Sequence, residues 1–405
     1  MHILFLTDNF PPEGNAPATR TYEHAVEWVK LGHKVTVITC APNFPEGRVF
    51  EGFKNSFYSR STMDGIDLVR VKTFISSNEG FVLRILDFVS FMFSSFFAGL
   101  FQRKVDIVLA TSPQFFTAVS GWALSAIKRK KFVFELRDIW PASITAVGAM
   151  KDSLAIKLLE KLELFLYRRS DSIISVTKSF KKELIERGIN GDKISVVLNG
   201  VDLTKYQSTQ SKDTKFAKQY QLENKFVVGY IGTHGLAHAL EHVIDAAEHL
   251  KAYDSVRFIF AGGGAVRDKL IELVEQKQLT NVVFIPRQPK ENMPAIWSLC
   301  DVSLVSLRDT ALFKTVIPSK IFESMGMGLP ILASIPVGEA SEIIETANAG
   351  IICTPENGKN LADNVLKLLN SKKFLSELHL NSSRAAVQFD RKAMASSMLE
   401  ILTKI

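Results

Sequence analysis

The sequence predicts an α/β protein made of two Rossmann-like domains in tandem, each built on a parallel sheet. Its 405 residues exceed the usual size of one domain. Short apolar, β-rich runs alternate with longer segments of helical periodicity, which is typical of parallel α/β folds. The same alternation restarts after a polar stretch at residues 208–218. With 46% hydrophobic and 22% charged residues, the composition excludes disordered and low-complexity proteins.

The strands can be predicted in order along the chain. In the first domain we expect them at 3–6, 35–39, 68–71, 106–110, 132–135, 172–176 and 194–198. In the second domain we expect them at 227–231, 256–261, 282–285, 302–305, 331–333 and 350–353. The turn residues Asn199-Gly200 indicate a hinge, so the domains are predicted as residues 1–200 and 201–388. The amphipathic segment 389–405 is predicted to pack back on the first domain.

Positive charge and phenylalanine are concentrated in the first domain. The net charge is +7, and residues 1–195 hold +6 of it, with 26 basic against 20 acidic residues. Seven of the 29 phenylalanines lie within 81–101, a segment flanked by Arg84, Arg103 and Lys104. Its longest uncharged run, 88–102, is shorter than the roughly 20 residues of a membrane-spanning helix. We therefore expect peripheral membrane contact through 81–104, with a buried helix or a protein partner as alternatives.

Other sequence features limit the cellular compartment and the binding partners that can be expected. The three cysteines are widely separated, which fits a reducing compartment better than a disulfide framework. The N-terminal run MHILFLTD lacks a basic n-region, so we expect a first strand there and no signal peptide. Zinc-finger spacing and RNP-like aromatic patterns are absent from the sequence, and we expect no nucleic acid partner. The predicted location is the cytoplasm, on the inner face of the cytoplasmic membrane.

Glycine patterns exclude two common nucleotide-binding motifs. The loop after the first strand, NFPPEGNAPATR, holds only Gly14, and no G-x-G-x-x-G follows any predicted strand. The run Ala261-Gly262-Gly263-Gly264 lacks the third spaced glycine, and no Walker A lysine pattern occurs. Ligands of open α/β sheets nevertheless bind at the carboxyl ends of the strands, so a nucleotide and a second substrate are expected there.

The most informative stretch is 317–344, IPSKIFESMGMGLPILASIPVGEASEII. Pro318 and Ser319 indicate a helix start with Ser319 as the cap, and glycines with Pro330 end the helix before a strand. Lys320 and Glu323 then share one face near the helix N-terminus. A mobile lysine beside free N–H groups suits a diphosphate, and Glu323 can accept two ribose hydroxyls. The alternative is an ordinary surface ion pair.

Taken in order, several motifs resemble the retaining glycosyltransferases of family 4, whose two facing Rossmann-like domains form the GT-B fold around a central cleft. The resemblance rests on segments spread over most of the chain. They are the first loop with Gly14, LGHKVTV at 31–37, SVVLNGVD at 195–202, VGYIG at 228–232, 260–264, 281–285, 300–306, the Glu323 helix with GLPI at 328–331, and EII at 342–344.

The resemblance implies a nucleotide-sugar donor site in the second domain and an acceptor site in the first. Glu323 matches the second glutamate of the family's E-x7-E motif, but Thr315 stands in the place of the first, and Asp309 is a possible substitute. Thr233 and His238 replace the family's diphosphate-binding cations, which leaves Lys320 and His234 to compensate. The implied donor-binding residues are Gly14, Asn15, Gly232, His234, Gly262, Arg287, Lys320 and Glu323.

The implied catalytic residues are Lys320, Arg137 and Asp138. Arg137 and Asp138 lie where many members place a histidine that contacts the 6-hydroxyl of the transferred sugar, so their presence fits a 6-deoxy sugar. A local ion pair is the alternative for these two residues.

The resemblance extends to transferases of the N-acetylfucosamine (FucNAc) type in O-antigen clusters. We therefore expect transfer of an N-acetyl deoxyamino sugar from UDP to a polyprenyl-diphosphate-linked saccharide in surface polysaccharide synthesis, with retention. The UDP-sugar is a substrate, and no cofactor is expected. No D-x-D motif occurs, so no metal is expected. A UDP-N-acetylglucosamine 2-epimerase and a catalytically silent nucleotide-sugar-binding subunit are the alternatives.

Overall fold

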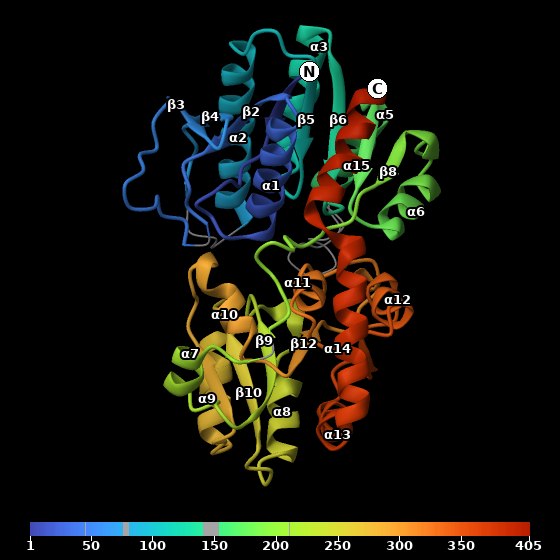
Figure 1. Ribbon diagram of the computed structural model, residues 1–405. Coiled ribbons are helices and arrows are strands. Elements are labelled where there is room, and N and C mark those ends of the chain that lie inside the picture. The colour runs from blue at the N-terminus through green and yellow to red at the C-terminus, as the bar shows by residue number, and fades with distance from the viewer. Residues whose placement is uncertain (45, 76–80, 141–153, 210) are drawn as a thin grey trace. The chain divides into compact units, whose positions relative to one another are not determined.

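The computed structural model describes all residues except 45, 76–80, 141–153 and 210. The chain divides into two compact units. Unit 1 comprises Met1–Asn199 together with Arg391–Ile405, and unit 2 comprises Gly200–Asp390. Both are α/β structures with a central sheet and helices on its faces (Figure 1).

Unit 1 contains an eight-stranded sheet in the order β3-β4-β2-β1-β5-β6-β7-β8. All neighbouring pairs are parallel except β3 and β4, which form an antiparallel hairpin. The strands are β1 His2–Leu6, β2 Lys34–Cys40, β3 Tyr58–Met63, β4 Ile66–Val71, β5 Ile107–Thr111, β6 Lys131–Leu136, β7 Ser172–Ser175 and β8 Ile194–Val196. The helices are α1 Ala16–Lys30, α2 Phe81–Leu100, α3 Phe116–Lys128, α5 Leu154–Arg169, α6 Lys178–Glu186 and α15 Arg391–Lys404, with a 3-10 turn η1 at Gly191–Lys193.

Unit 2 contains a six-stranded, wholly parallel sheet in the order β11-β10-β9-β12-β13-β14. Its strands are β9 Phe226–Ile231, β10 Val256–Ala261, β11 Val282–Ile285, β12 Val302–Ser306, β13 Ile331–Ser334 and β14 Gly350–Cys353. Its α-helices are α7 Thr214–Gln219, α8 Glu241–His249, α9 Arg267–Gln276, α10 Met293–Trp297, α11 Lys320–Gly326, α12 Glu339–Thr346, α13 Gly358–Asn370 and α14 Lys372–Ala386. Short 3-10 turns lie at η2 Leu236–His238, η3 Lys290–Asn292, η4 Leu312–Lys314 and η5 Val387–Phe389.

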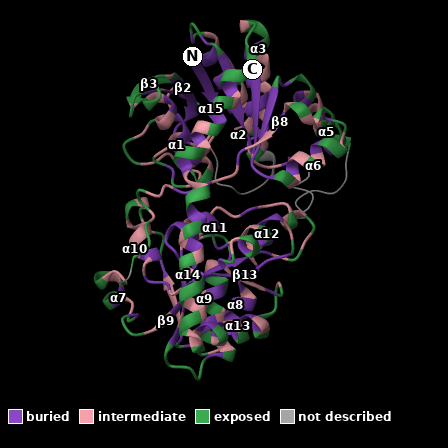
Figure 2. Cartoon of the chain, turned by 45° about the vertical axis from the view of Figure 1, so that its right-hand side comes forward, coloured by how far each residue is buried: buried purple, intermediate pink, exposed green. Residues whose placement is uncertain are grey.

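Every strand predicted from the sequence is present, with ends within two residues of the prediction. Apart from the edge strand β3, the sheets contain the most deeply buried strands of each unit, as the purple strands in Figure 2 show. The prediction omitted β3, whose sequence YSRSTM is almost fully exposed and has no apolar alternation. β3 is joined to β4 through Asp64-Gly65, both with positive φ, which is the turn chemistry that hairpins prefer.

The C-terminal helix α15 packs against α1 inside unit 1. The indole N–H of Trp28 donates to the carbonyl oxygen of Ala395 over 2.8 Å. Met398 and Leu402 join the same apolar cluster as Trp28 and Phe5. The chain thus returns to the first sheet after passing through unit 2.

Helix α2 has one packed face and one exposed face. On the packed side Phe91 is buried, the Ser95 hydroxyl donates to Ser120, and a Cβ added at Gly99 would lie 2.4 Å from the Leu124 side chain. Among the described residues α2 is the helix whose length and apolar composition would suffice to cross a membrane, over Leu83–Leu100, and 22% of that window is buried. The exposed apolar side chains are Leu83, Leu86, Phe93 and Phe97, and Phe101 follows at the end of the helix.

Candidate active site

Two glycine-containing loops leave the carboxyl ends of β9 and β10 and lie directly against each other. The N–H of Gly232 donates to the carbonyl oxygen of Ala261, and the N–H of Gly262 donates to that of Ile285. Gly262 has φ +141°, and a Cβ there would lie 2.1 Å from the Gly232 carbonyl oxygen. Both the backbone conformation and the lack of space therefore require glycine at 262.

The side chain of Lys320 lies beneath the first of these loops. Its Nζ is 3.6 Å from the centroid of the Tyr230 ring and 3.1 Å from where a Cβ on Gly232 would lie. Lys320 is only 9% exposed, and its Nζ has no hydrogen-bond acceptor among the described residues. Burial lowers the pKa of this amine to about 7, against the opposing effect of Glu323. A buried amine that faces an aromatic ring and has no hydrogen-bond acceptor would be stabilised in its charged form by an anion bound beside it.

Two histidines lie close to this lysine. His234 is fully buried, and neither ring nitrogen has a partner within the described parts of the chain. Burial, followed by the positive charges of Arg267 and Lys320, lowers the pKa of His234 to about 4. Burial likewise lowers the pKa of His238 to about 3, and its Nδ1 lies 3.2 Å from the Ser306 carbonyl oxygen. Both imidazoles are therefore neutral at pH 7, and that of His234 is free to donate a hydrogen bond to an anion.

The start of α11 differs from the prediction in two respects. Ser319 was expected to cap the helix with its side chain, and this is wrong, since the side chain makes no capping bond. Its φ of −59° and ψ of −29° are already helical, whereas a side-chain cap requires an extended residue. Lys320 was also expected to be a mobile surface cation, but it is buried. The alternative that Lys320 and Glu323 form an ordinary surface ion pair is therefore excluded.

The remaining predicted residues of unit 2 lie around this cluster or beyond it. Glu323 is half-buried one turn after Lys320 on α11. Thr315 follows η4, and its hydroxyl donates to the Leu312 carbonyl oxygen over 2.8 Å. Arg287 and Asp309 are both exposed, and the backbone N–H of Asp309 donates to Glu356.

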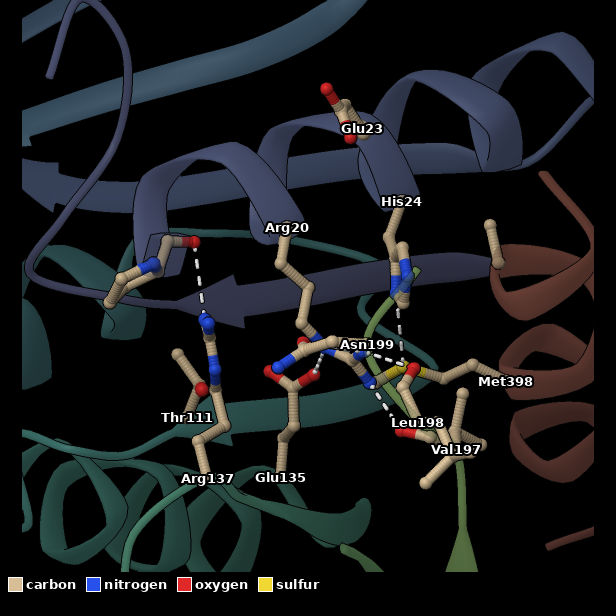
Figure 3. A network of polar contacts seen from close by, with 12 residues as sticks. Arg20, Glu23, His24, Thr111, Glu135, Arg137, Val197, Leu198, Asn199 and Met398 are labelled. Carbon is tan, nitrogen blue, oxygen red and sulfur yellow. Dashed lines mark hydrogen bonds and ion pairs between the residues drawn. The ribbon is translucent and has the colours of Figure 1, made fainter. Parts of the chain in front are cut away.

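In unit 1 a buried cation is fully paired (Figure 3). The Nε of Arg20 lies 2.8 Å from the Glu135 carboxylate, and both side chains are almost completely buried. The other guanidinium nitrogens donate to the carbonyl oxygens of Val197 and Leu198 and to the Asn199 side chain. Burial would raise the pKa of Glu135, but the charges of Arg20 and Arg137 outweigh it and hold that pKa below its usual value. This network fixes residues 197–199, where the chain leaves unit 1 for unit 2, to the sheet of unit 1.

Arg137 and Asp138 follow β6 at the carboxyl edge of the same sheet. Their backbone N–H groups both donate to the Ser112 hydroxyl, over 2.7 and 3.1 Å. The Arg137 guanidinium donates to the Pro17 carbonyl oxygen, which brings it to the start of α1 (Figure 3). Burial lowers the pKa of Arg137 to about 10.

The first loop of unit 1 contains the other two predicted residues. Asn15 caps α1, since its side-chain oxygen accepts from the N–H of Ala18 over 2.8 Å and its amide donates to Asn9. Gly14 is exposed, and a Cβ added there would meet nothing within 4 Å. Asn15 therefore stabilises the start of α1, and Gly14 leaves open space at the carboxyl end of β1.

Two family matches correspond to the two units. Residues 17–205 match the family described as Glycosyltransferase Family 4, and residues 211–386 match Glycosyl transferases group 1. The protein carries the two domains of a GT-B glycosyltransferase.

Relatives and solved structures agree with this assignment. The chain is 26% identical over 381 residues to the glycosyl transferase WcaI of Escherichia coli strain K12, named for colanic acid biosynthesis, covering 91% of this chain and 92% of the relative. It superposes on sucrose-phosphate synthase from Thermosynechococcus elongatus with a TM-score of 0.80, 14% identity and coverage of 100% and 98%. It superposes on HepE from Anabaena, crystallised with UDP and glucose, with a TM-score of 0.74, 19% identity and coverage of 100% and 99%.

The structure thus brings Gly232, His234, Gly262 and Lys320 of this glycosyltransferase together in unit 2. It brings Asn15 and Arg137 to the start of α1 in unit 1.

Sequence reasoning missed two neighbours of this cluster, Tyr230 under Lys320 and Arg267 near His234. Arg267 begins α9, three residues after Gly264. A cation in the first turn of a helix is unfavourable next to the positive end of the helix dipole, so Arg267 could have been recognised from the sequence as an unusual residue at this position. Tyr230 carried no such signal, because a tyrosine inside a strand pattern is ordinary.

Proposed function

We propose that this glycosyltransferase moves an N-acetyl deoxyamino sugar, such as N-acetylfucosamine, from UDP to a polyprenyl-diphosphate-linked saccharide. The process would be the assembly of O-antigen or another bacterial surface polysaccharide. The observation that carries the donor half of this proposal is the buried Lys320 amine, whose Nζ has no hydrogen-bond acceptor among the described residues. A nucleoside diphosphate supplies the missing negative charge.

The two kinds of relative support different parts of the proposal. WcaI is named for the synthesis of colanic acid, a surface polysaccharide, which supports the pathway. HepE was crystallised with UDP and glucose, which supports UDP as the nucleotide. The deoxyamino sugar rests on the family resemblance, in which Arg137 and Asp138 replace the histidine that contacts the 6-hydroxyl of the transferred sugar in many members.

In the proposed reaction, unit 2 stabilises the leaving diphosphate. As the glycosidic bond breaks, negative charge grows on the β-phosphate, and Lys320 is placed to neutralise it. The neutral imidazole of His234 donates a hydrogen bond to a phosphate oxygen without adding charge. Glu323 accepts from the ribose hydroxyls. This cationic and N–H-rich environment is the proposed basis of metal-independent leaving-group stabilisation.

The acceptor would bind at the carboxyl edge of the unit 1 sheet, where Arg137 and Asp138 follow β6. We propose retention through front-face attack. In that mechanism the acceptor oxygen forms its bond to the anomeric carbon as the bond to UDP breaks, and its proton passes to the departing phosphate oxygen. No side chain of this protein then has to act as the nucleophile.

We further propose that the protein works on the cytoplasmic face of the cytoplasmic membrane as a peripheral protein. The exposed apolar side chains of α2 support this, because they lie within roughly 80° of one another around the helix axis. The opposite face of α2 packs on α3, so the helix presents a stripe to an apolar layer while staying part of unit 1.

The test is a donor panel of UDP-N-acetylglucosamine, UDP-N-acetylfucosamine, UDP-N-acetylquinovosamine and GDP-sugars. Each is incubated with a short-chain lipid-diphosphate N-acetylglucosamine acceptor, and the product is identified by mass. We expect UDP release and a product one deoxyamino sugar heavier, only when the acceptor is present. Acceptor-independent conversion of UDP-N-acetylglucosamine would identify an epimerase instead. Binding of UDP-sugars without turnover on any acceptor of this class would identify a silent subunit.

A further inference from the structure

Unit 1 has a pocket at the amino-terminal edge of its sheet, opposite the edge where Arg137 and Asp138 follow β6. Its volume is about 620 Å³, within the usual range of ligand pockets. It is formed where β1, β2 and β5 begin, with linings that include His2, Lys34 and Asp106. Arg137 lies at the carboxyl ends of the strands. Because a strand of five residues is about 16 Å long, the two places are separate sites.

The lining of this pocket is strongly basic. Lys34, Arg103 and Lys104 are exposed there, and none of the three forms an ion pair within the described residues. Arg60 also lines the pocket but is paired with Asp67. Asp106 is the acidic residue among the lining residues, and its carboxylate accepts from the backbone N–H of His2 over 2.7 Å. The three unpaired cations therefore favour an anionic occupant.

The wall that carries these cations is held rigidly. The Nζ of Lys128 donates to the carbonyl oxygens of Leu100 and Gln102, over 3.0 and 2.7 Å. The buried Gln102 amide donates back to the Ala98 carbonyl oxygen. His2 also lines the pocket, and its ring lies with Nδ1 3.1 Å from the Lys104 carbonyl oxygen and Nε2 2.8 Å from the Thr36 hydroxyl. Arg103 and Lys104 thus extend from a fixed segment.

The pocket continues directly into the exposed stripe of α2. Phe101 lines the pocket and is 76% exposed. It lies four and eight residues after Phe97 and Phe93, so the three rings follow one line along the helix and its end. An apolar stripe that ends at a basic pocket matches the two parts of an anionic lipid, whose acyl chains are apolar and whose headgroup carries a phosphate.

We propose that this pocket binds the phosphate of an anionic membrane lipid while Phe93, Phe97 and Phe101 enter the apolar layer. Lys34, Arg103 and Lys104 contact the headgroup. This inference rests on the proposed peripheral membrane attachment and adds to it a defined headgroup site. The site is distinct from the acceptor site, so a bound lipid would anchor the enzyme without competing with the saccharide that it elongates.

The experiment measures binding of the full-length protein to vesicles by sedimentation. One set of vesicles is phosphatidylcholine alone, and the other contains about one third phosphatidylglycerol. The pocket variant combines Lys34→Gln with Arg103→Gln. The control combines Lys161→Gln with Lys182→Gln, which removes the same charge from exposed positions outside the pocket. A third variant combines Phe93→Ser with Phe97→Ser.

Each basic residue at an anionic surface contributes about 1 kcal/mol, so the pocket variant should bind the phosphatidylglycerol vesicles about 30-fold more weakly. On phosphatidylcholine vesicles, to which the unmodified protein binds more weakly, the pocket variant should bind as the unmodified protein does. The control variant should bind both kinds of vesicle with an affinity within about threefold of that of the unmodified protein. The phenylalanine variant should lose binding to both kinds of vesicle. Inorganic phosphate should weaken binding to the anionic vesicles more than chloride at equal ionic strength.

Equal losses in the pocket variant and the control would overturn the site, because diffuse charge would then explain the binding. Binding of free phosphate without any preference for phosphatidylglycerol vesicles would overturn the lipid assignment. If the unmodified protein binds neither kind of vesicle, the membrane attachment itself fails. UDP binding, measured on the same preparations by titration calorimetry, reports separately on the proposed donor site and should be equal in all four proteins.

Discussion

Replacing Lys320 by methionine should stabilise the empty protein and at the same time weaken its binding of UDP. Burial lowers the pKa of Lys320 from 10.5 to about 7. At 1.36 kcal/mol per pKa unit, this shift means that burying the charged form of Lys320 lowers the free energy of unfolding by as much as about 5 kcal/mol. Methionine has nearly the same length without the charge, so the Lys320→Met protein should recover a large part of that cost at pH 6.

The pH dependence follows from the direction of the shift. Between pH 7 and 10.5 the unfolded chain keeps the proton on Lys320 while the native state has lost it. The unfolded state then binds more protons, so the free energy of unfolding rises with pH over this interval. Below pH 7 the penalty is fully present. In Lys320→Met this rise should be missing.

Calorimetric unfolding at pH 6 and pH 9 measures both effects. The transition of unit 2 can be identified as the one that moves to higher temperature when UDP is added. Loss of a charge-assisted hydrogen bond, about 1.5 to 3 kcal/mol, should weaken UDP binding about 10- to 150-fold. In the unmodified protein UDP binding above pH 7 should also take up a proton, which titration in buffers of different ionisation enthalpy detects.

The opposite outcome has a distinct signature. If Lys320 served only the fold, for example through Glu323, the Lys320→Met protein would unfold at a lower temperature and bind UDP normally. That pair of results would refute the diphosphate assignment. Lys320→Arg is the matched control, because it keeps the charge and should retain more UDP affinity than methionine does.

Three further substitutions test other parts of the structure. Glu323→Gln should weaken binding of UDP at least about tenfold but leave the binding of 2′,3′-dideoxy-UDP, which has neither ribose hydroxyl, nearly unaffected, and equal losses in titration calorimetry would contradict the ribose contact. Gly262→Ala should lower stability by about 2 kcal/mol or more in thermal unfolding, since its Cβ meets the neighbouring loop, whereas Gly14→Ala should stay within about 0.5 kcal/mol. Glu135→Gln should cost about 3 to 5 kcal/mol by removing the carboxylate that pairs with Arg20, and an unchanged urea midpoint would argue against this pairing. Because the pKa of Glu135 is held below its usual value, the unmodified protein should lose stability as the pH falls and Glu135 is protonated.

The fold could be predicted because buried parallel strands carry their own signal. The strands β9 and β10, for instance, are nearly continuous apolar runs, and a glycine follows each of them. β3 could not be found in this way, because its side chains are exposed and show no apolar alternation. The Asp64-Gly65 turn was the one available sign of that hairpin.

The candidate site was only partly visible in the sequence. Lys320 could be singled out from its place at a helix start, but its burial under the β9 loop depends on the packing of α11 against the strand ends. Ser319 shows the limit of local rules, since its residue type suits a cap and its backbone conformation does not. The sequence predicts His234 as a replacement for a missing cation. In the folded unit, however, burial lowers the pKa of His234 and leaves the imidazole neutral, and this burial could not be predicted from the local sequence.

Arg20 and Lys320 are both buried cationic residues, and they differ in how well the fold supplies them with hydrogen-bond acceptors. Arg20 in unit 1 finds a carboxylate, two carbonyl oxygens and an amide oxygen, so this fold can satisfy a buried cation completely when stability is all that is required. Lys320 in unit 2 has an aromatic ring and no acceptor among the described residues. Because an unpaired buried charge costs several kcal/mol, the fold gains nothing from Lys320 by itself. A function that requires an anion at this position gives a physical reason for keeping it.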